Sequence, residues 1–148
     1  MHLTLRFLGK VQLENVAELE RRLREQVTGF GELDLVCERP GCFPNPRRPR
    51  VVGTWVHDAG ERLAALHRCV EEAVGCFAEK PAEQNFIGHV TLARPKQITL
   101  VEGNRLVHFI ERAVGRRFGE WRCREIELIQ SELSADGSRY TTLAKVGL

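Results

Sequence analysis

The four-residue pattern His-x-Thr-Leu occurs twice in this chain, at His2–Leu5 and at His89–Leu92. Each copy lies in a short apolar run that is typical of a β-strand. Because side chains alternate between the two faces of a strand, the histidine and the threonine of each copy share one face. The apolar residues of both copies are expected on the opposite face, namely Leu3, Leu5, Phe7, Val90 and Leu92. Two such strands side by side would line a polar cleft.

The side chains His2, Thr4, His89 and Thr91 suit acid–base chemistry on a phosphoryl group. Histidine has an ordinary pKa of about 6.5, so one of two facing imidazoles can be neutral while the other is protonated. Threonine hydroxyls donate hydrogen bonds to anionic oxygens without adding negative charge. Hydrolysis of a cyclic phosphodiester needs a base for water and an acid for the leaving oxygen. One His-x-Thr is common by chance, but two copies in similar strands favour this function.

The composition is that of one globular domain. The chain has 148 residues, of which 43% are hydrophobic and 28% charged, enough to bury a core. The net charge is only +2, so any RNA binding has to be local. Arg47, Arg48 and Arg50 form a local basic cluster in a Pro-rich turn, which either contacts an RNA backbone or is a solvated loop.

Motifs for cofactors and for export are missing from the sequence. The five cysteines form no Cys-x-x-Cys pair and lack the spacing of metal ligands. A P-loop and a Gly-x-Gly-x-x-Gly pattern are also lacking, so we expect no cofactor, no metal and no use of ATP. The sequence has neither a signal peptide nor a long apolar run, which indicates a cytoplasmic protein without membrane association.

Hydrophobic periodicity predicts alternating strands and helices. Strands are expected near Met1–Leu8, Leu33–Cys37, Arg50–Val56, Ile87–Ala93, Trp121–Gln130 and Tyr140–Val146, and helices at 14–27, 59–79 and 101–114. The second and third strands should pair as a hairpin, and Ala135–Gly137 should form the turn between the last two. In the third helix, four residues are expected to point inward: Leu106, Phe109, Ile110 and Val114. The order of elements predicts an α+β fold with mostly antiparallel pairing.

Four stretches of the chain resemble one known family. They are HLTLRFLG (His2–Gly9), GCFPNPRRPRVV (Gly41–Val52), HVTLAR (His89–Arg94) and SELSADGSRYTTL (Ser131–Leu143). Over nearly its whole length the chain is similar to the RNA 2′,3′-cyclic phosphodiesterases, also called the 2′-5′ RNA ligase family, within the two-histidine (2H) phosphoesterase superfamily. The resemblance implies a bilobal α+β fold with mostly antiparallel sheets, helices packed on the outside and a central cleft that carries both motifs.

The resemblance also implies a reaction. The substrate would be an RNA or oligonucleotide with a terminal 2′,3′-cyclic phosphate, which is hydrolysed to a 2′-phosphate without metal or cofactor. His89 would be the general base that activates water, and His2 the general acid that protonates the departing 3′ oxygen. Thr4 and Thr91 would hold the non-bridging phosphate oxygens.

Further contacts are expected around this centre. Arg94 matches a family position near the phosphate, where its guanidinium would neutralise charge. Phe43 is expected to stack on a base, with Arg47 and Arg48 as RNA contacts. For Phe7, which falls on the apolar face of its strand, core packing is expected instead.

The chain departs from the family at its start. Members usually have a strand and a helix before the first motif, whereas here that motif begins at residue 2. We therefore expect residues 1–148 to form a single, N-terminally shortened domain. Its uncovered sheet edge would allow chains to form oligomers. Two alternatives to the hydrolase remain, a non-catalytic nucleotide- or RNA-binding module of the same fold and 2′-5′ RNA ligation, the reverse of the hydrolytic chemistry.

Overall fold

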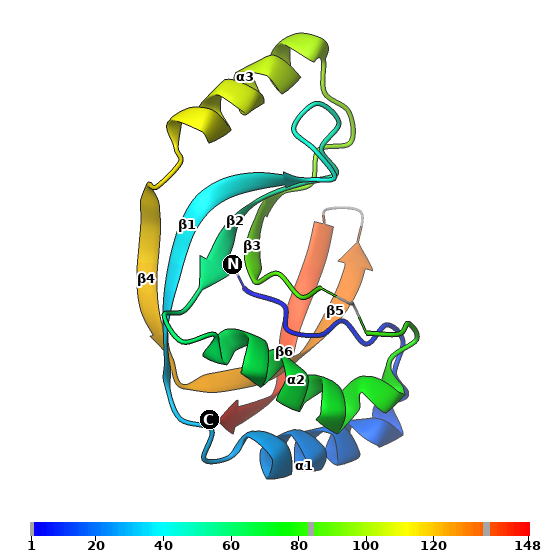
Figure 1. Ribbon diagram of the computed structural model, residues 1–148. Helices are drawn as coiled ribbons and strands as arrows, with labels where there is room; N and C mark the ends of the chain where they lie inside the picture. The colour runs from blue at the N-terminus through cyan, green and yellow to red at the C-terminus, as the bar shows by residue number, and fades with distance from the viewer. Residues whose placement is uncertain (1, 83–84, 135–136) are drawn as a thin grey trace. The chain divides into compact units, whose positions relative to one another are not determined.

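The computed structural model describes residues 2–82, 85–134 and 137–148 (Figure 1). The chain divides into two compact units. Unit 1 comprises Met1–Leu5, Asp34–Leu63 and Asn85–Trp121, and unit 2 comprises Arg6–Leu33, Ala64–Gln84 and Arg122–Leu148. The helices are α1 (Val16–Val27), α2 (Arg62–Val74) and α3 (Leu100–Arg112), with short 3-10 helices at Leu13–Asn15 and Gly75–Phe77. The strands are β1 (Leu33–Phe43), β2 (Val51–His57), β3 (His89–Ala93), β4 (Arg117–Cys123), β5 (Glu125–Ser134) and β6 (Gly137–Gly147). The predicted α+β class with antiparallel pairing is confirmed.

The sheet of unit 1 has the strand order β3-β2-β1-β4. β1 and β2 pair antiparallel, which confirms the predicted hairpin, and β2 also pairs antiparallel with β3. The buried face of this sheet carries the side chains of Cys37, Thr54 and Val56. The buried hydroxyl of Thr54 donates to the carbonyl of Glu38 at 3.1 Å, so it keeps a partner away from water. β2 is thus an inner strand, paired with β1 on one side and with β3 on the other.

The first His-x-Thr motif does not lie in a strand, so the prediction of a strand at Met1–Leu8 is wrong. Leu3 forms an isolated antiparallel bridge with Val90, and the pairing goes no further. The carbonyl of Leu8 instead accepts a hydrogen bond from the amide of Glu79 at 2.9 Å, a bond within unit 2 that replaces pairing with β3. Because strand alternation ends here, Phe7 is 70% exposed and does not pack in the core as expected.

Helix α2 is shorter than predicted but carries the expected apolar stripe. Leu63, Leu66, Val70 and Ala73 are all buried. The carboxylate of Asp58 accepts hydrogen bonds from the amides of Gly60, Arg62 and Leu63 at 3.3, 2.8 and 3.1 Å. These amides would otherwise lack partners at the start of the helix, so Asp58 places that start at Arg62.

Helix α3 begins with a capping box. The hydroxyl of Thr99 accepts from the amide of Glu102, while the Glu102 carboxylate accepts from the amide of Thr99 at 2.7 Å. Its packed side runs through Gly103 and ends at Ala113, both of which are buried. The prediction that Phe109 and Val114 point inward is wrong, since they are 50% and 70% exposed. Phe109 lies off the packed stripe, and Val114 lies beyond the end of the helix.

Unit 2 contains α1 and the antiparallel pair β5–β6. Figure 1 shows these two strands side by side. Leu19, Leu23 and Val27 form the buried side of α1, as its periodicity predicts, and α1 packs against β6. The predicted strand Trp121–Gln130 is two strands of different sheets, because the chain leaves β4 and enters β5 at Arg124. In the predicted turn Ala135–Gly137, the first two residues lie outside the described part of the chain.

The buried side chain of Arg6 connects its segment to the rest of unit 2. The side chain of Arg6 is only 7% exposed, and its Nε lies 2.8 Å from a carboxylate oxygen of Glu71 on α2. The two other guanidinium nitrogens donate to the carbonyls of Lys80 and Pro81 at 2.6 and 3.3 Å. A buried charge needs such partners to offset the loss of its hydration.

Candidate active site

The bridge between Leu3 and Val90 sets the register of the two motifs. In an antiparallel pair, residues directly opposite each other project to the same face. Continued by one position on either side, this register would set His2 opposite Thr91 and Thr4 opposite His89. The four predicted side chains would then share one face, opposite that of Leu3 and Val90. His2 and Thr4 are exposed, whereas His89 and Thr91 are half-buried.

The imidazole of His89 is held in a defined orientation. Its Nδ1 lies 2.9 Å from the carbonyl oxygen of Ile87. A carbonyl can only accept a hydrogen bond, so Nδ1 carries the proton and a neutral ring presents its lone pair at Nε2. In the part of the chain that the structure describes, Nε2 has no hydrogen-bond partner. This is the arrangement that a general base requires.

Two aromatic rings lie beside His89. The ring of Phe43 is 5.7 Å from the imidazole between centroids, and the ring of Trp55 is 6.1 Å from it. Phe43 and Trp55 also contact each other edge to face at 4.8 Å. Trp55 is the cross-strand partner of His89 in the β2–β3 pairing. Trp55 is not among the site residues predicted from the sequence, because only the register of β2 against β3 identifies it.

Glycines on the same face make room for the indole of Trp55. A Cβ at Gly41 would overlap the indole, so the ring lies against the backbone of β1. Gly53 pairs with Gly41 on one side and with Thr91 on the other. A Cβ at Gly53 would come within 2.7 Å of the carbonyl oxygen of Val90. Gly53 therefore allows β3 to approach β2 closely next to Thr91.

A β-bulge at Leu92 changes the side of the sheet to which the residues after it project. Gly53 pairs with Thr91 and Val52 with Ala93, which leaves Leu92 as the extra residue. Leu92 is 55% exposed, so the expectation that it faces the apolar side is wrong. The bulge inverts the alternation, so a continuation of the strand by one residue would direct Arg94 to the face of Thr91. In a regular strand, Arg94 would project to the side opposite His89.

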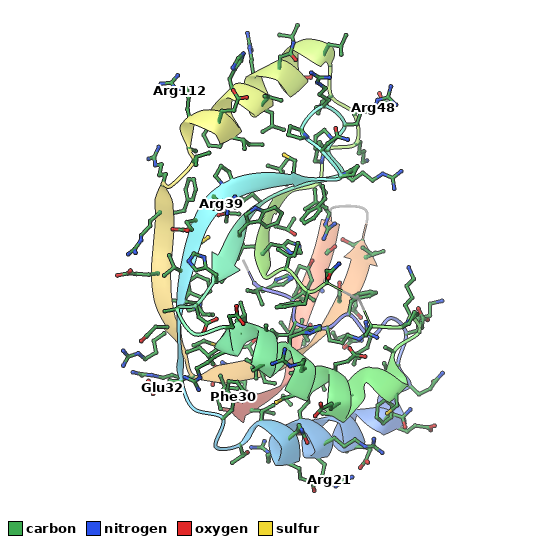
Figure 2. The ribbon with its side chains drawn as sticks, in the orientation of Figure 1. Arg21, Phe30, Glu32, Arg39, Arg48 and Arg112 are labelled. Atoms are coloured by element: carbon green, nitrogen blue, oxygen red, sulfur yellow. The ribbon has the colours of Figure 1, made fainter. Side chains whose placement is uncertain are left out.

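Phe43 begins a structured loop that carries Arg47 and Arg48. The side-chain oxygen of Asn45 accepts from the amides of both arginines at 3.1 and 3.0 Å. The amide of Arg50 donates to the carbonyl of Phe43 at 2.6 Å and closes the loop. Both arginine side chains are exposed, and Figure 2 shows Arg48 pointing away from the ribbon. All predicted site residues thus belong to unit 1: His2, Thr4, Phe43, Arg47, Arg48, His89, Thr91 and Arg94.

Among the residues that the structure describes, no three His, Cys, Asp or Glu side chains are grouped so that they could hold a metal ion. Within the same residues, no helix combines the length and apolar character needed to span a membrane.

The antiparallel α+β fold, with the two His-x-Thr segments joined at Leu3 and Val90, is what a two-histidine phosphoesterase is expected to have. The chain is a member of the LigT like phosphoesterase family, whose family model matches residues 1–53 and 55–140.

Relatives and solved structures agree with this family. The chain is 34% identical over 143 residues to the RNA 2′,3′-cyclic phosphodiesterase of Archaeoglobus fulgidus, a match that covers 97% of this chain and 77% of that protein. It is 33% identical over 145 residues to the protein of the same name from Aeropyrum pernix, with 98% and 80% covered. The crystal structure of TT0787 of Thermus thermophilus has a TM-score of 0.72 at 27% identity and covers 99% of this chain and 77% of its own. E. coli LigT in complex with 3′-AMP shares the fold, with a TM-score of 0.71 at 21% identity over 99% and 76% of the two chains.

Proposed function

We propose that this protein is an RNA 2′,3′-cyclic phosphodiesterase that opens a terminal cyclic phosphate to a 2′-phosphate. The names of its relatives support this activity. The single observation that carries the mechanism is the Leu3–Val90 bridge. Its register supports an arrangement with His2 and His89 as diagonal neighbours across the two segments, a relation that separates Cα atoms by about 7–8 Å. Thr4 and Thr91 occupy the other diagonal.

This crossed arrangement suits an in-line displacement at phosphorus. The attacking and the leaving oxygen lie on opposite sides of a phosphorus atom during such a step. Two histidines on one diagonal can therefore serve the two oxygens from opposite sides. The hydroxyls of Thr4 and Thr91 can donate to the non-bridging oxygens between them, where negative charge increases in the transition state.

The proton transfers follow from these positions. Nε2 of His89 accepts a proton from a water molecule as the water oxygen bonds to phosphorus. The bond from phosphorus to the 3′ oxygen breaks, and protonated His2 donates its proton to that oxygen. The products are a 2′-phosphate and a free 3′-hydroxyl. Arg94, on the face of Thr91, adds a positive charge near the phosphate.

The rings of Phe43 and Trp55 provide a surface for the terminal base. Their centroids lie 5.7 and 6.1 Å from the centroid of the His89 imidazole. Aromatic faces bind bases with little preference for sequence, and each stacking contact is worth on the order of 1–3 kcal/mol. We infer that one ring or both support the base of the terminal nucleotide.

The test uses the purified chain without metal or ATP. A short RNA that ends in a 2′,3′-cyclic phosphate is incubated with it, and chromatography separates 2′- from 3′-phosphate products. We expect the 2′-phosphate, with a loss of at least about 100-fold in rate for His89→Ala and for His2→Ala. His108→Ala is the matched control, because His108 is an exposed histidine that pairs with Glu111 on α3. No conversion by folded protein, or full activity of either site variant, would contradict the proposal.

A binding measurement and a ligation assay distinguish the non-catalytic module and the ligase from the hydrolase. A non-catalytic module would bind the cyclic end without forming product. A ligase would join two RNA pieces, one ending in the cyclic phosphate and one beginning with a 5′-hydroxyl, through a 2′-5′ bond.

A further inference from the structure

The small net charge of the chain conceals an uneven distribution between its units. Unit 1 contains 11 Lys and Arg against 7 Asp and Glu, and unit 2 contains 11 against 13. Their net charges are therefore +4 and −2, which add up to the +2 of the whole chain. The excess positive charge belongs to the unit that contains the two histidines.

In unit 2 the basic side chains are largely neutralised by ion pairs within the unit. Glu18 on α1 accepts hydrogen bonds from Arg21 and Arg22, which lower the pKa of that carboxyl to about 2. Lys145 lies 2.6 and 2.9 Å from the carboxylates of Glu125 and Glu127. Cations paired in this way have little attraction left for an external polyanion.

Unit 1, by contrast, contains arginines without such partners. Among the residues that the structure describes, Arg47, Arg48, Arg94 and Arg112 have no carboxylate within ion-pair distance. Figure 2 shows Arg48 beside the loop after β1 and Arg112 at the C-terminal end of α3, each with its side chain directed away from the ribbon. Unpaired like charges repel one another, so their gathering in one unit favours binding of a polyanion.

The loop with Arg47 and Arg48 is preorganised and connected to the site. The hydrogen bonds of Asn45 and of Arg50 fix its backbone. On α3, Gly103 lies against it, where an added Cβ would be 3.5 Å from the Cα of Arg47. The loop starts at Phe43, whose ring contacts His89. Arginines on a fixed backbone lose less conformational entropy when they bind phosphate.

We propose that the loop 44–50, with Arg47 and Arg48, binds the backbone phosphates of the RNA chain that precedes the cyclic end. A 2′,3′-cyclic phosphate can only be the last group of an RNA, so the remaining chain extends from its 5′ side. The protein then prefers oligonucleotides to mononucleotides as substrates. This inference rests on the proposed phosphodiesterase function and names its substrate class.

The experiment compares two substrates that share the reacting group. One is cytidine 2′,3′-cyclic phosphate, and the other is a tetranucleotide that ends in the same cytidine cyclic phosphate. We expect a kcat/KM at least about tenfold higher for the tetranucleotide at low salt. Arg47→Ala combined with Arg48→Ala should remove most of this advantage, so that the ratio of the two kcat/KM values falls towards one.

Salt dependence gives an independent measurement. Each phosphate contact on single-stranded nucleic acid contributes a slope of about 0.7 in the logarithmic plot of affinity against salt. The double alanine variant should therefore lower the slope for the tetranucleotide by roughly 1.4. Arg47→Lys with Arg48→Lys keeps both charges and should retain the slope. Arg68→Ala with Lys80→Ala, which removes two exposed charges from unit 2, should leave both substrates unaffected.

The outcomes separate this inference from the proposed function. Equal kcat/KM for the two substrates, or equal losses on both in the alanine variant, would overturn the inference while the phosphodiesterase assignment stands. If neither substrate is turned over, the proposed function is wrong. Binding of a fluorescent tetranucleotide that ends in 2′-phosphate then still tests the loop, because unchanged affinity in the alanine variant would refute it without any turnover.

Discussion

Leu3 and Val90 form an antiparallel β-bridge between two segments that are far apart in the sequence. In the proposed site, the register of this bridge sets each histidine opposite the threonine of the other motif, so both motifs are needed. A shift of one residue would turn one motif to the opposite face. The chemistry of the proposed site thus depends on a pairing that is shorter than a strand.

The proposed mechanism makes the pH dependence a direct test. Turnover requires one imidazole to be neutral and the other to be protonated, and histidines titrate between about pH 5 and 8. We expect kcat/KM for a cyclic phosphate substrate to follow a bell-shaped curve, whose two limbs belong to the pair of histidines together. A flat profile from about pH 5 to pH 9 would contradict acid–base catalysis by two histidines.

Gly53→Ala tests the close approach of β3, which carries Val90, to β2. The new Cβ would lie 2.7 Å from the carbonyl oxygen of Val90, a backbone atom that can move only with β3. We expect a loss of about 1–3 kcal/mol in the free energy of unfolding, measured in urea, and a lower kcat/KM. Gly119→Ala is the control, because nothing lies within 4 Å of its added Cβ. Unchanged stability and activity of Gly53→Ala would disprove the close approach.

Gly41→Ala tests the position of Trp55. Its Cβ would overlap the indole, so the ring must leave its place beside Phe43 and His89. The chain has two tryptophans, and fluorescence in a Trp121→Phe background reports on Trp55 alone. We expect a shifted emission maximum and weaker binding of a cyclic nucleotide. An unchanged spectrum would show that the indole does not cover Gly41.

Arg6→Ala tests the buried ion pair of unit 2. The substitution leaves the Glu71 carboxylate, which is 24% exposed, without its counter-ion. We expect a loss of about 2–4 kcal/mol in the free energy of unfolding. Arg21→Ala breaks an exposed pair on α1 and should leave the free energy of unfolding nearly unchanged, because water screens that pair. A double-mutant cycle with Glu71→Gln measures the coupling, and a value near zero would argue against the pair.

Asp58→Asn tests the start of α2 through acid stability. Burial raises the pKa of Asp58, but hydrogen bonds from the amides of Leu63, Arg62 and Gly60 outweigh it, so the pKa lies below its ordinary value of 3.8. A lowered pKa adds stability that is present above the unfolded value and disappears as the pH falls through the folded value. We expect a deficit in the free energy of unfolding at pH 7 that disappears as the pH falls below 3.8 and through the lower pKa of the folded state.

The control for Asp58 is Glu61→Gln, which changes an exposed carboxylate in the same loop. Its stability should follow that of the parent at every pH. If Asp58→Asn showed the same deficit at pH 7 and at acid pH, the ionised carboxylate would not be what stabilises the helix.

The local periodicity of the sequence determined the elements whose burial pattern is regular. It predicted the buried side of α1 with Leu19 and Leu23, the β1–β2 hairpin and the apolar stripe of α2. It failed where tertiary contacts break the local pattern. The amide of Glu79 bonds the carbonyl of Leu8 within unit 2, and the chain changes sheet at Arg124.

For the site, the sequence by itself predicted which groups would do the proposed chemistry, because the repeated His-x-Thr pattern lies within two short segments. Only the tertiary structure decided which residues join them. The cross-strand position of Trp55, the bulge at Leu92 and the crossing of the two motifs at Leu3 and Val90 all depend on register. Register is set by hydrogen bonds between segments that are distant in the chain, and no local sequence pattern encodes those bonds.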